Sequence, residues 1–251
     1  MSRGRAKLTI AEGVSVWVLE ALDGFGDAAY HAHHAIQFTV ALSGSLKLVT
    51  DRHSLEGNAL AVAADVRHRF EAHGLLAFIF IEPESRLGRA LRHRLFESAG
   101  LVALDPVMAA QRLEPLAHTF EAALGNDCLV AAGRAFAEEI AGGGAAPLPD
   151  ARVRRILDYA KSHLDEPLTL STAAQGIYLS PSRLRHLFVE QTGLPFKTYV
   201  LWLRLIKAVQ IYSAGSALTE AALAAGFSDS AHFSRIFRRT FGLPATTLTR
   251  F

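Results

Sequence analysis

The stretch that decides the fold of the C-terminal part runs Ala222-Leu-Ala-Ala-Gly-Phe-Ser-Asp-Ser-Ala-His-Phe-Ser-Arg-Ile-Phe-Arg-Arg-Thr-Phe-Gly242. Its first residues are mostly alanines, which permit close helix contact, and Gly226 suits a tight turn. Further on, Phe233, Ile236 and Phe237 recur at intervals of three and four, which predicts a helix with one buried face. Serine and arginine side chains occupy the opposite face, and Ser228 is expected to cap this helix. The pattern predicts a helix-turn-helix whose second helix fits the major groove of DNA.

The same pattern recurs about forty to fifty residues upstream, between Leu170 and Gly193. Here Ser180 is expected to cap the second helix, and Pro181 to take its first position. Internal repetition makes two helix-turn-helix units a stronger prediction than either copy alone. Between the units, the spacing from Pro195 to about Ser213 predicts one long helix of about 27 Å. Such a rod would hold the two second helices about one DNA turn apart.

Residues from about Asp150 to Arg250 resemble the DNA-binding domain of the AraC/XylS family of bacterial transcription regulators. The motifs that carry the resemblance are Leu179-Ser-Pro-Ser-Arg-Leu184, Gly193-Leu-Pro-Phe-Lys-Thr-Tyr199, Arg204-Leu-Ile-Lys-Ala208 and Gly226-Phe-Ser-Asp-Ser-Ala-His-Phe-Ser-Arg-Ile-Phe237. The resemblance implies a sequence-specific DNA-binding regulator, not an enzyme, with an N-terminal sensor domain. Double-stranded DNA, a small-molecule or metal effector and a second copy of the chain are the implied partners, and RNA polymerase enters as a further candidate.

The resemblance also implies which side chains meet DNA. Arginine is the strongest chemical candidate for a base contact, because its guanidinium pairs with guanine O6 and N7. The positions that match base readers are Ser182, Arg183, Arg185 and His186 in the first unit, with Arg183 near the backbone, and Ser230, Ala231, Ser234 and Arg235 in the second. Lys197, Arg238 and Arg239 match phosphate contacts, which position a protein without specifying a sequence.

Charge divides the chain in the same place. Residues 1–150 contain 13 Lys and Arg against 18 Asp and Glu, a net charge of −5, whereas residues 151–251 contain 13 against 6, a net charge of +7. A cationic C-terminal part suits a polyanion such as DNA. With one cysteine, Cys128, and no run of about 18 apolar residues, the chain is expected to be a soluble, cytoplasmic protein.

In the N-terminal part apolar residues recur at every second position, as they do in strands, for example at Val14, Val16 and Val18. From Glu84 the period becomes helical, and Ala141-Gly-Gly-Gly-Ala-Ala-Pro-Leu-Pro149 is typical of a linker. We therefore expect an α+β protein: a cupin-like barrel over 1–83, a helical dimerisation segment over 84–141, a linker over 142–149, and an all-α double helix-turn-helix domain over 150–251.

A histidine-rich stretch, Tyr30-His-Ala-His-His-Ala-Ile-Gln37, is the other candidate for chemistry. His31 and His33 would share one face of a strand and could chelate a metal together. The spacing Gly26-x4-His31-x-His33-x3-Gln37-x6-Gly44 resembles the first cupin motif, with Gln37 where those sites usually carry Glu. His68 is the candidate for a third ligand, and His34 is expected at the surface.

Three roles for these residues stay open at this stage. His31, His33, His68 and Gln37 could hold a divalent metal ion, could line an organic-effector site, or could be structural polar residues near a barrel rim. A cupin enzyme is the rival from another class, because three neutral imidazoles suit metal chemistry. An enzyme would not need two helix-turn-helix units. A nucleic-acid coating protein would have uniformly basic faces, whereas the polar faces here are short and varied.

Overall fold

The computed structural model describes residues 6–21, 28–122, 126–143 and 147–247. They form two compact units, one made of residues 1–146 with 237–251 and the other of residues 147–236. Among the described residues, the first unit holds the β-sheet, the helices between residues 86 and 141, and the chain from Phe237 on, whereas the second holds the remaining helix-turn-helix elements. This combination confirms the expected α+β class, whereas the cupin-like barrel and the expected domain limits stay predictions.

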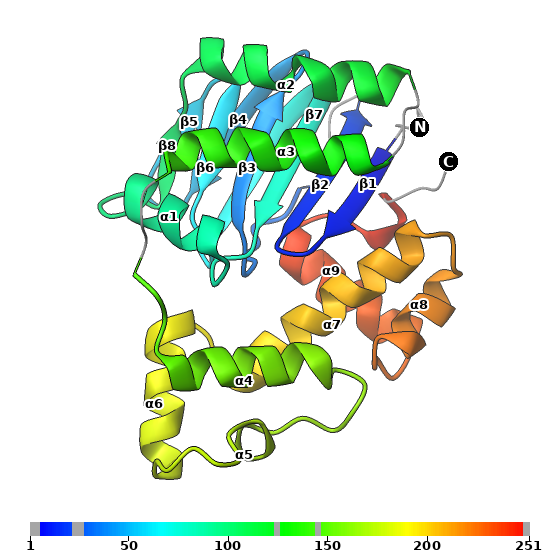
Figure 1. The fold of residues 1–251 in the computed structure, drawn as a ribbon. Coiled ribbons are helices and arrows are strands. Elements are labelled where there is room, and N and C mark those ends of the chain that lie inside the picture. The colour runs from blue at the N-terminus through cyan, green and yellow to red at the C-terminus, as the bar shows by residue number, and fades with distance from the viewer. Residues whose placement is uncertain (1–5, 22–27, 123–125, 144–146, 248–251) are drawn as a thin grey trace. The chain divides into compact units, whose positions relative to one another are not determined.

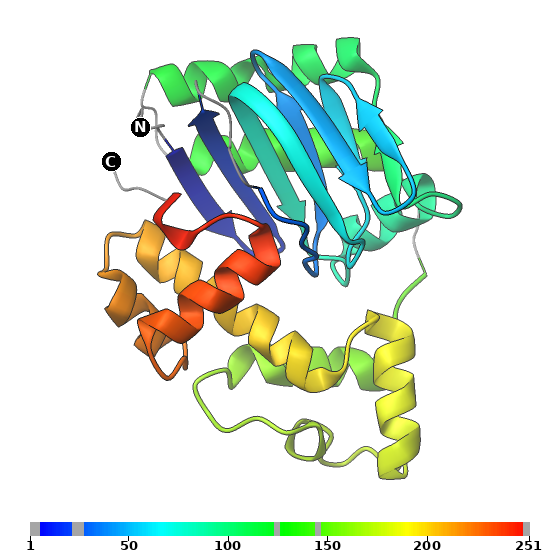
Figure 2. The same ribbon diagram turned by 180° about the vertical axis from the view of Figure 1, so that it is seen from behind.

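The β-sheet of the first unit is antiparallel throughout and has eight strands, in the order β1-β2-β7-β3-β6-β8, with β4 pairing β7 and β5. Figure 2 shows the strands from the side opposite the helices between residues 86 and 141. The strands are β1 (Ala6–Ala11), β2 (Val14–Ala21), β3 (Ile36–Ala41), β4 (Ser45–Thr50), β5 (Ser54–Glu56), β6 (Ala59–Val62), β7 (His68–Ile81) and β8 (Leu101–Ala103).

Strand β7 organises the sheet because its two halves pair with different neighbours. Its first six residues, His68 to His73, pair with β4, and its last residues pair with β2 on one side and β3 on the other. The continuous apolar run Leu75–Ile81 is buried, as its composition predicts for a strand covered on both faces. One strand therefore connects the histidine-bearing end of the sheet with its apolar core.

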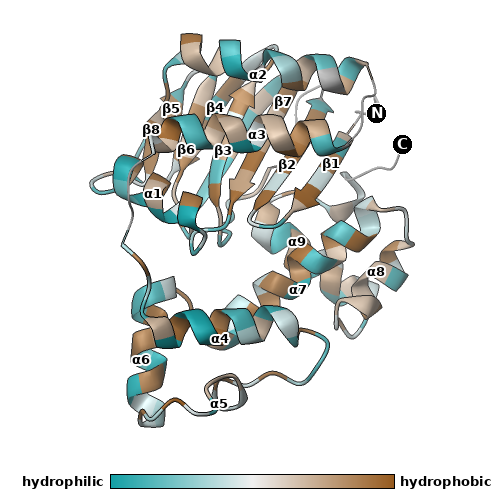
Figure 3. Cartoon of the chain, in the orientation of Figure 1, coloured by the Kyte–Doolittle hydropathy of each residue, from teal (hydrophilic) through white to brown (hydrophobic). Residues whose placement is uncertain are grey.

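Helices α1 (Arg86–Leu95), α2 (Pro106–Glu121) and α3 (Asn126–Ala141) pack on one face of this sheet (Figure 1). The core between the layers combines sheet residues such as Val16, Phe38 and Ile79 with helix residues such as Leu116 and Phe136. Each large apolar side chain buried here stabilises the fold by roughly 1.5–3 kcal/mol. Figure 3 shows the same division in hydropathy, with teal residues along the outer sides of α2 and α3.

The second unit is helical. Its elements are α4 (Ala151–Ser162), α5 (Leu170–Ala173), α6 (Pro181–Thr192), α7 (Phe196–Ser213), α8 (Leu218–Ala224) and the first part of α9 (Ser230–Phe241). Asp150 caps α4 by accepting a hydrogen bond from the Arg152 amide. Helices α5 and α6 form the first helix-turn-helix, and α8 and α9 form the second.

Helix α7 joins the two helix-turn-helix units and packs against both. Tyr199 and Val200 near its start join the core of the first unit with Phe188 of α6. Further along α7, Leu205 and Ala208 are buried, and so are Ala221 and Ala222 of the neighbouring helix α8. The predicted long helix is thus confirmed with 18 residues. No helix among the described residues combines the length and apolar character that a bilayer crossing requires.

Candidate DNA-reading faces and histidine cluster

The first candidate reading face lies on α6. The helix begins as the sequence predicts, since the Ser180 hydroxyl accepts a hydrogen bond from the Arg183 amide at 3.3 Å and Pro181 is its first residue. Leu184 and Phe188 are buried against α7 and α4. The four predicted base readers are exposed, and they are Ser182, Arg183, Arg185 and His186. Burial of one side of α6 therefore holds all four predicted side chains out to solvent.

The second candidate reading face lies on α9, whose start differs from the prediction. The cap is Asp229 and not Ser228: the Asp229 carboxylate accepts a hydrogen bond from the His232 amide at 2.6 Å. That bond, with a second from the Ser228 hydroxyl, holds the pKa of the Asp229 carboxyl below its ordinary value. Aspartate caps a helix start as well as serine does, so sequence spacing alone does not distinguish two adjacent cap residues.

The predicted readers of α9 are not equally available. Ala231 and Arg235 are exposed, whereas Ser230 and Ser234 are half-buried. The Ser234 hydroxyl donates to the Ser230 carbonyl at 2.8 Å, within its own helix. A base contact by Ser234 would then use the oxygen as acceptor or break that bond. The predicted phosphate contacts Lys197, Arg238 and Arg239 are all exposed.

The second candidate site is the histidine cluster, which we define as His31, His33 and His68. His31 and His68 form an isolated antiparallel bridge, in which each amide donates to the other's carbonyl at 2.8 Å. The three side chains are 4%, 3% and 0% exposed, and one nitrogen from each lies within 4.8 Å of the others. The structure thus brings together residues that the sequence separates by more than thirty positions.

Backbone carbonyls orient the three imidazoles. The Nδ1 atoms of His31, His33 and His68 lie 2.8, 3.1 and 2.9 Å from the carbonyl oxygens of Ala29, Ala35 and Val66. Burial lowers the pKa of all three, that of His31 to about 4, and the neighbouring rings lower the pKa of His31 and His68 further. The imidazoles are therefore neutral at pH 7, and a neutral ring with Nδ1–H bonded to a carbonyl carries its lone pair on Nε2.

Gln37, the fourth predicted site residue, lies beside the cluster on β3 and is 2% exposed. Its Oε1 lies 2.8 Å from His33 Nε2, and its amide nitrogen donates to the Thr39 hydroxyl at 2.7 Å. Gly26, the first residue of the predicted motif, lies outside the described residues. The structure therefore groups all four predicted side chains in one buried polar site.

The expectation that His34 lies at the surface is wrong. His34 is 3% exposed, and its two ring nitrogens lie 2.8 Å from carboxylate oxygens of Asp65 and Glu84. Burial by itself would lower the His34 pKa, but the hydrogen bonds to these two carboxylates outweigh it and raise the pKa to about 9. The missing signal was the pair of acidic residues, 31 and 50 positions away in the sequence.

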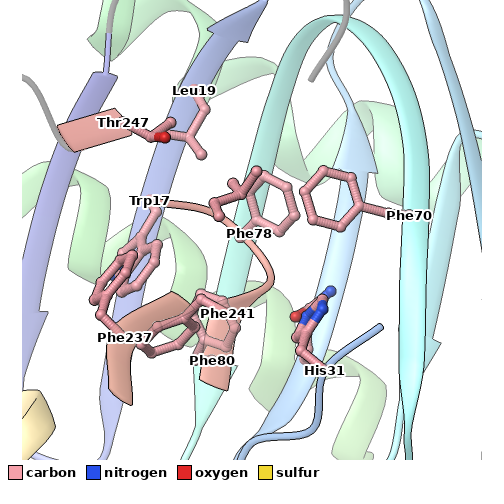
Figure 4. Close-up of a pocket in the computed structure, with 11 residues that line it drawn as sticks. Trp17, Leu19, His31, Phe70, Phe78, Phe80, Phe237, Phe241 and Thr247 are labelled. Atoms are coloured by element: carbon pink, nitrogen blue, oxygen red, sulfur yellow. The ribbon is translucent and has the colours of Figure 1, made fainter. Parts of the chain in front are cut away.

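An aromatic pocket adjoins the cluster, and sequence patterns alone assigned it no role (Figure 4). Trp17 and Leu19 of β2 and Phe70, Phe78 and Phe80 of β7 line it, with the polar edges of His31 and Gln37. The C-terminal segment of the same unit adds Phe237, Phe241, Leu243 and Thr247. The alternation of side chains along β2 could have predicted this pocket, because Trp17 and Leu19 point to the opposite face of the sheet from Val16 and Val18.

Comparison with known proteins places the C-terminal elements. A family model described as a helix-turn-helix domain matches residues 173–250. The chain is 34% identical over 102 residues to YpdC of Escherichia coli K12, an uncharacterized HTH-type transcriptional regulator, covering 40% of this chain and 36% of YpdC. It is 37% identical over 93 residues to the HTH-type transcriptional activator RhaS of Citrobacter koseri, covering 37% of this chain and 34% of RhaS. The matched segment spans about a third of these relatives' length.

A likeness in fold extends over nearly the whole chain. ToxT of Vibrio cholerae superposes with a TM-score of 0.57 at 15% identity, over 98% of this chain and 96% of ToxT. Another ToxT structure, with an unsaturated fatty acid bound, covers 97% of this chain and 95% of ToxT with a TM-score of 0.55 at 16% identity. The fold of a sheet domain joined to helix-turn-helix elements is thus shared with ToxT. Residues 173–250, with most of the two helix-turn-helix units, are thus similar to the helix-turn-helix domain of transcription regulators such as RhaS.

Proposed function

We propose that this chain is a sequence-specific DNA-binding transcription regulator that reads two adjacent major grooves with α6 and α9. The observation that carries the proposal is the pair of exposed polar faces on these helices, joined by the 18-residue helix α7. At 1.5 Å per residue α7 is about 27 Å long. That length is close to the roughly 34 Å between successive turns of one DNA groove, so one rigid element spaces both readers.

The proposed contacts divide into two kinds. Ser182, Arg185 and His186 on α6, and Ala231 and Arg235 on α9, are proposed to meet base edges, with Ser230 and Ser234 at the margin of the second contact. Arg183, Lys197, Arg238 and Arg239 are proposed to meet phosphates. Base contacts supply the choice of sequence, whereas phosphate contacts supply most of the sequence-independent affinity.

The sheet domain is proposed to sense an effector in the cytoplasm, where a regulator meets DNA. Support comes from the buried polar site at His31, His33, Gln37 and His68 beside an aromatic pocket, because ligand sites combine apolar walls with a few oriented polar groups. The fatty-acid complex of ToxT, a protein of similar fold, adds support for a ligand in this domain. The effector is a small molecule or a metal ion.

The helices between Glu84 and Ile140 are proposed to carry a two-fold contact between two copies of the chain. Val107 at the start of α2 is 64% exposed, so one apolar side chain of this helix is open to a second copy. Analytical ultracentrifugation of the full chain at micromolar concentration should give the mass of a dimer. A monomer, both alone and with DNA, would refute this contact. RNA polymerase is a further proposed partner of the DNA-bound form.

The regulator proposal is tested by gel retardation of DNA from upstream of the gene that encodes this chain. We expect the purified full-length chain to retard this DNA in the presence of excess competitor DNA, and Arg185→Ala with Arg235→Ala to abolish the preference. Metal-dependent turnover of a small substrate, without retardation of any fragment, would favour a cupin enzyme instead.

A further inference from the structure

The histidine cluster has the donor geometry of a metal site. Its three side chains come from two segments, residues 31–33 and the start of β7, which the His31–His68 bridge holds in register. One nitrogen from each ring lies within 4.8 Å of the other two. Two nitrogens bound to one ion at about 2.1 Å lie at most about 4.2 Å apart. The separation of up to 4.8 Å exceeds this limit by about 0.6 Å, so the rings have to rotate toward a common centre to share one ion.

A buried nitrogen without a partner is the second observation. Among the described residues nothing hydrogen-bonds to His68 Nε2, although His68 is 0% exposed. Leaving a buried polar atom in this state is unfavourable. A cluster that served only to stabilise the fold would gain by pairing this nitrogen or by replacing the ring with an apolar side chain. An ion bound to Nε2 satisfies it.

The hydrogen bonds behind the three rings already have the arrangement that metal sites use. In each ring the Nδ1 atom faces a backbone carbonyl, that of Ala29, Ala35 or Val66. Metal-bound histidines almost always donate their other N–H in this way, which fixes the tautomer and aims the lone pair at the ion. For His31 and His68 the free lone pair is then on Nε2. The carbonyls thus orient the rings for an ion before it binds.

The contact between His33 and Gln37 points to the fourth ligand. A neutral imidazole has one N–H, yet His33 Nδ1 faces the Ala35 carbonyl and His33 Nε2 faces Gln37 Oε1. Both contacts cannot be hydrogen bonds of the neutral ring. In the metal-free chain the Gln37 amide can turn so that its nitrogen donates to Nε2. With a cation beside Nε2, the orientation with Oε1 toward the cluster is the favourable one.

From these observations we propose that His31, His33 and His68 bind one divalent first-row transition-metal ion through their Nε2 atoms, with Gln37 Oε1 as a fourth ligand. Three imidazoles suit zinc, iron, nickel or copper, whereas magnesium and calcium require oxygen ligands. The inference rests on the proposed sensor function, because it names the class of effector, or of effector-binding centre, at that same site. His31 and Gln37 also line the aromatic pocket, so the proposed site adjoins it.

The test uses the full-length chain without a polyhistidine tag, stripped with a chelator and titrated with Co²⁺ and then Zn²⁺. We expect one equivalent of Co²⁺ per chain, with visible d–d absorption that Zn²⁺ abolishes. X-ray absorption of the zinc-loaded wild type should count three imidazole nitrogens, a measurement that needs no variant. His31→Gln with His33→Gln should remove the absorption, and Gln37→Ala should weaken Zn²⁺ binding by about 10–100-fold. His53→Gln, at an exposed histidine in the β4–β5 turn, is the matched control and should bind as the wild type does.

The outcomes separate this inference from the proposed function. Failure of the folded wild type to take up Co²⁺ or Zn²⁺, or uptake that survives in the double variant, overturns the metal site. If the chain then still retards its upstream DNA, the regulator proposal stands with an organic effector. Stoichiometric metal binding by a chain that retards no DNA supports the metal site and overturns the regulator proposal. Circular dichroism and a cooperative thermal transition establish that each variant is folded.

Discussion

Neighbouring residues His33 and His34 show how strongly the surroundings decide a side chain's chemistry. Both are 3% exposed. His33 faces two uncharged oxygens, so burial lowers its pKa and the ring stays neutral. His34 faces two carboxylates, so its pKa rises to about 9 and the ring carries a charge at pH 7. One ring is therefore available to a cation, and the other is a cation itself.

Because of His34, the fold should become less stable at alkaline pH. Its pKa is about 9 in the folded chain against 6.5 in the unfolded chain, so its contribution is complete below about pH 6.5 and is lost as the pH rises through 9. The difference between these two pKa values corresponds to a contribution of roughly 3 kcal/mol. The free energy of unfolding, measured with a chelator between pH 6 and 10, should fall over this range for the wild type and should be flatter for His34→Gln. Parallel profiles for the two proteins would contradict the assignment.

Arginines on the two reading helices are expected to differ in what they specify. Arg185→Ala should cost about 1–3 kcal/mol at one base pair and relax the preference there, because it removes a guanidinium that pairs with a base edge. Arg239→Ala should weaken binding to all sequences about equally, and it serves as the matched control. Selection of binding sites from random DNA measures both effects. If the Arg185→Ala variant selected the same DNA motif as the wild type, Arg185 would not be a base-reading residue.

The close packing of helix α3 on strand β2 depends on Gly133, although glycine is unfavourable inside a helix. A Cβ atom at Gly133 would lie 2.5 Å from the Val16 methyl carbon Cγ2, well inside van der Waals contact. Val16 is 0% exposed and cannot move aside. The absence of a side chain at Gly133 is what allows the helix to lie so close to the sheet.

Gly133→Ala should therefore destabilise the chain, against the gain of about 1 kcal/mol that alanine ordinarily brings inside a helix. In a Val16→Ala background the clash is removed, so the same substitution should become stabilising. Chemical denaturation of the four proteins in this double-mutant cycle measures the coupling. If Gly133→Ala stabilised the protein in the wild-type background, there would be space for a methyl group between α3 and Val16, and the predicted clash would be wrong.

Helices were the elements that the sequence predicted best, because their period and their caps are local. Ser180 caps α6 as expected, and α7 spans 18 residues where one long helix was predicted. The histidine cluster was predicted by residue type, but its closure needed the long-range bridge between His31 and His68. Strand register and the ion pairs of His34 depend on partners far away in the sequence, so no local pattern reveals them.

For the whole molecule, the division of charge predicts how binding to DNA responds to salt. Residues 151–251 have a net charge of +7, and exposed lysine and arginine side chains include Lys197, Arg238 and Arg239. With about five phosphate contacts, affinity should fall roughly 10²–10³-fold between 50 and 200 mM salt, and Arg239→Ala should lower the slope by about one ion. Fluorescence anisotropy with labelled operator DNA measures both. An affinity that salt leaves unchanged would exclude phosphate contacts as its source.

Helix α7 sets an angle as well as a length, because each residue added to a helix turns the rest of the helix by about 100°. One inserted residue within Phe196–Ser213 would advance α9 by only about 1.5 Å but rotate its reading face away from the DNA. Seven inserted residues nearly restore the angle, yet they lengthen the rod by about 10 Å, or about three base pairs. The number of residues in α7 and the spacing of the two half-sites in the operator therefore depend on each other, and a change in one requires a change in the other. Such a chain can acquire new target sequences through substitutions on α6 and α9. Insertions or deletions in α7 would instead abolish simultaneous contact of both reading faces with DNA.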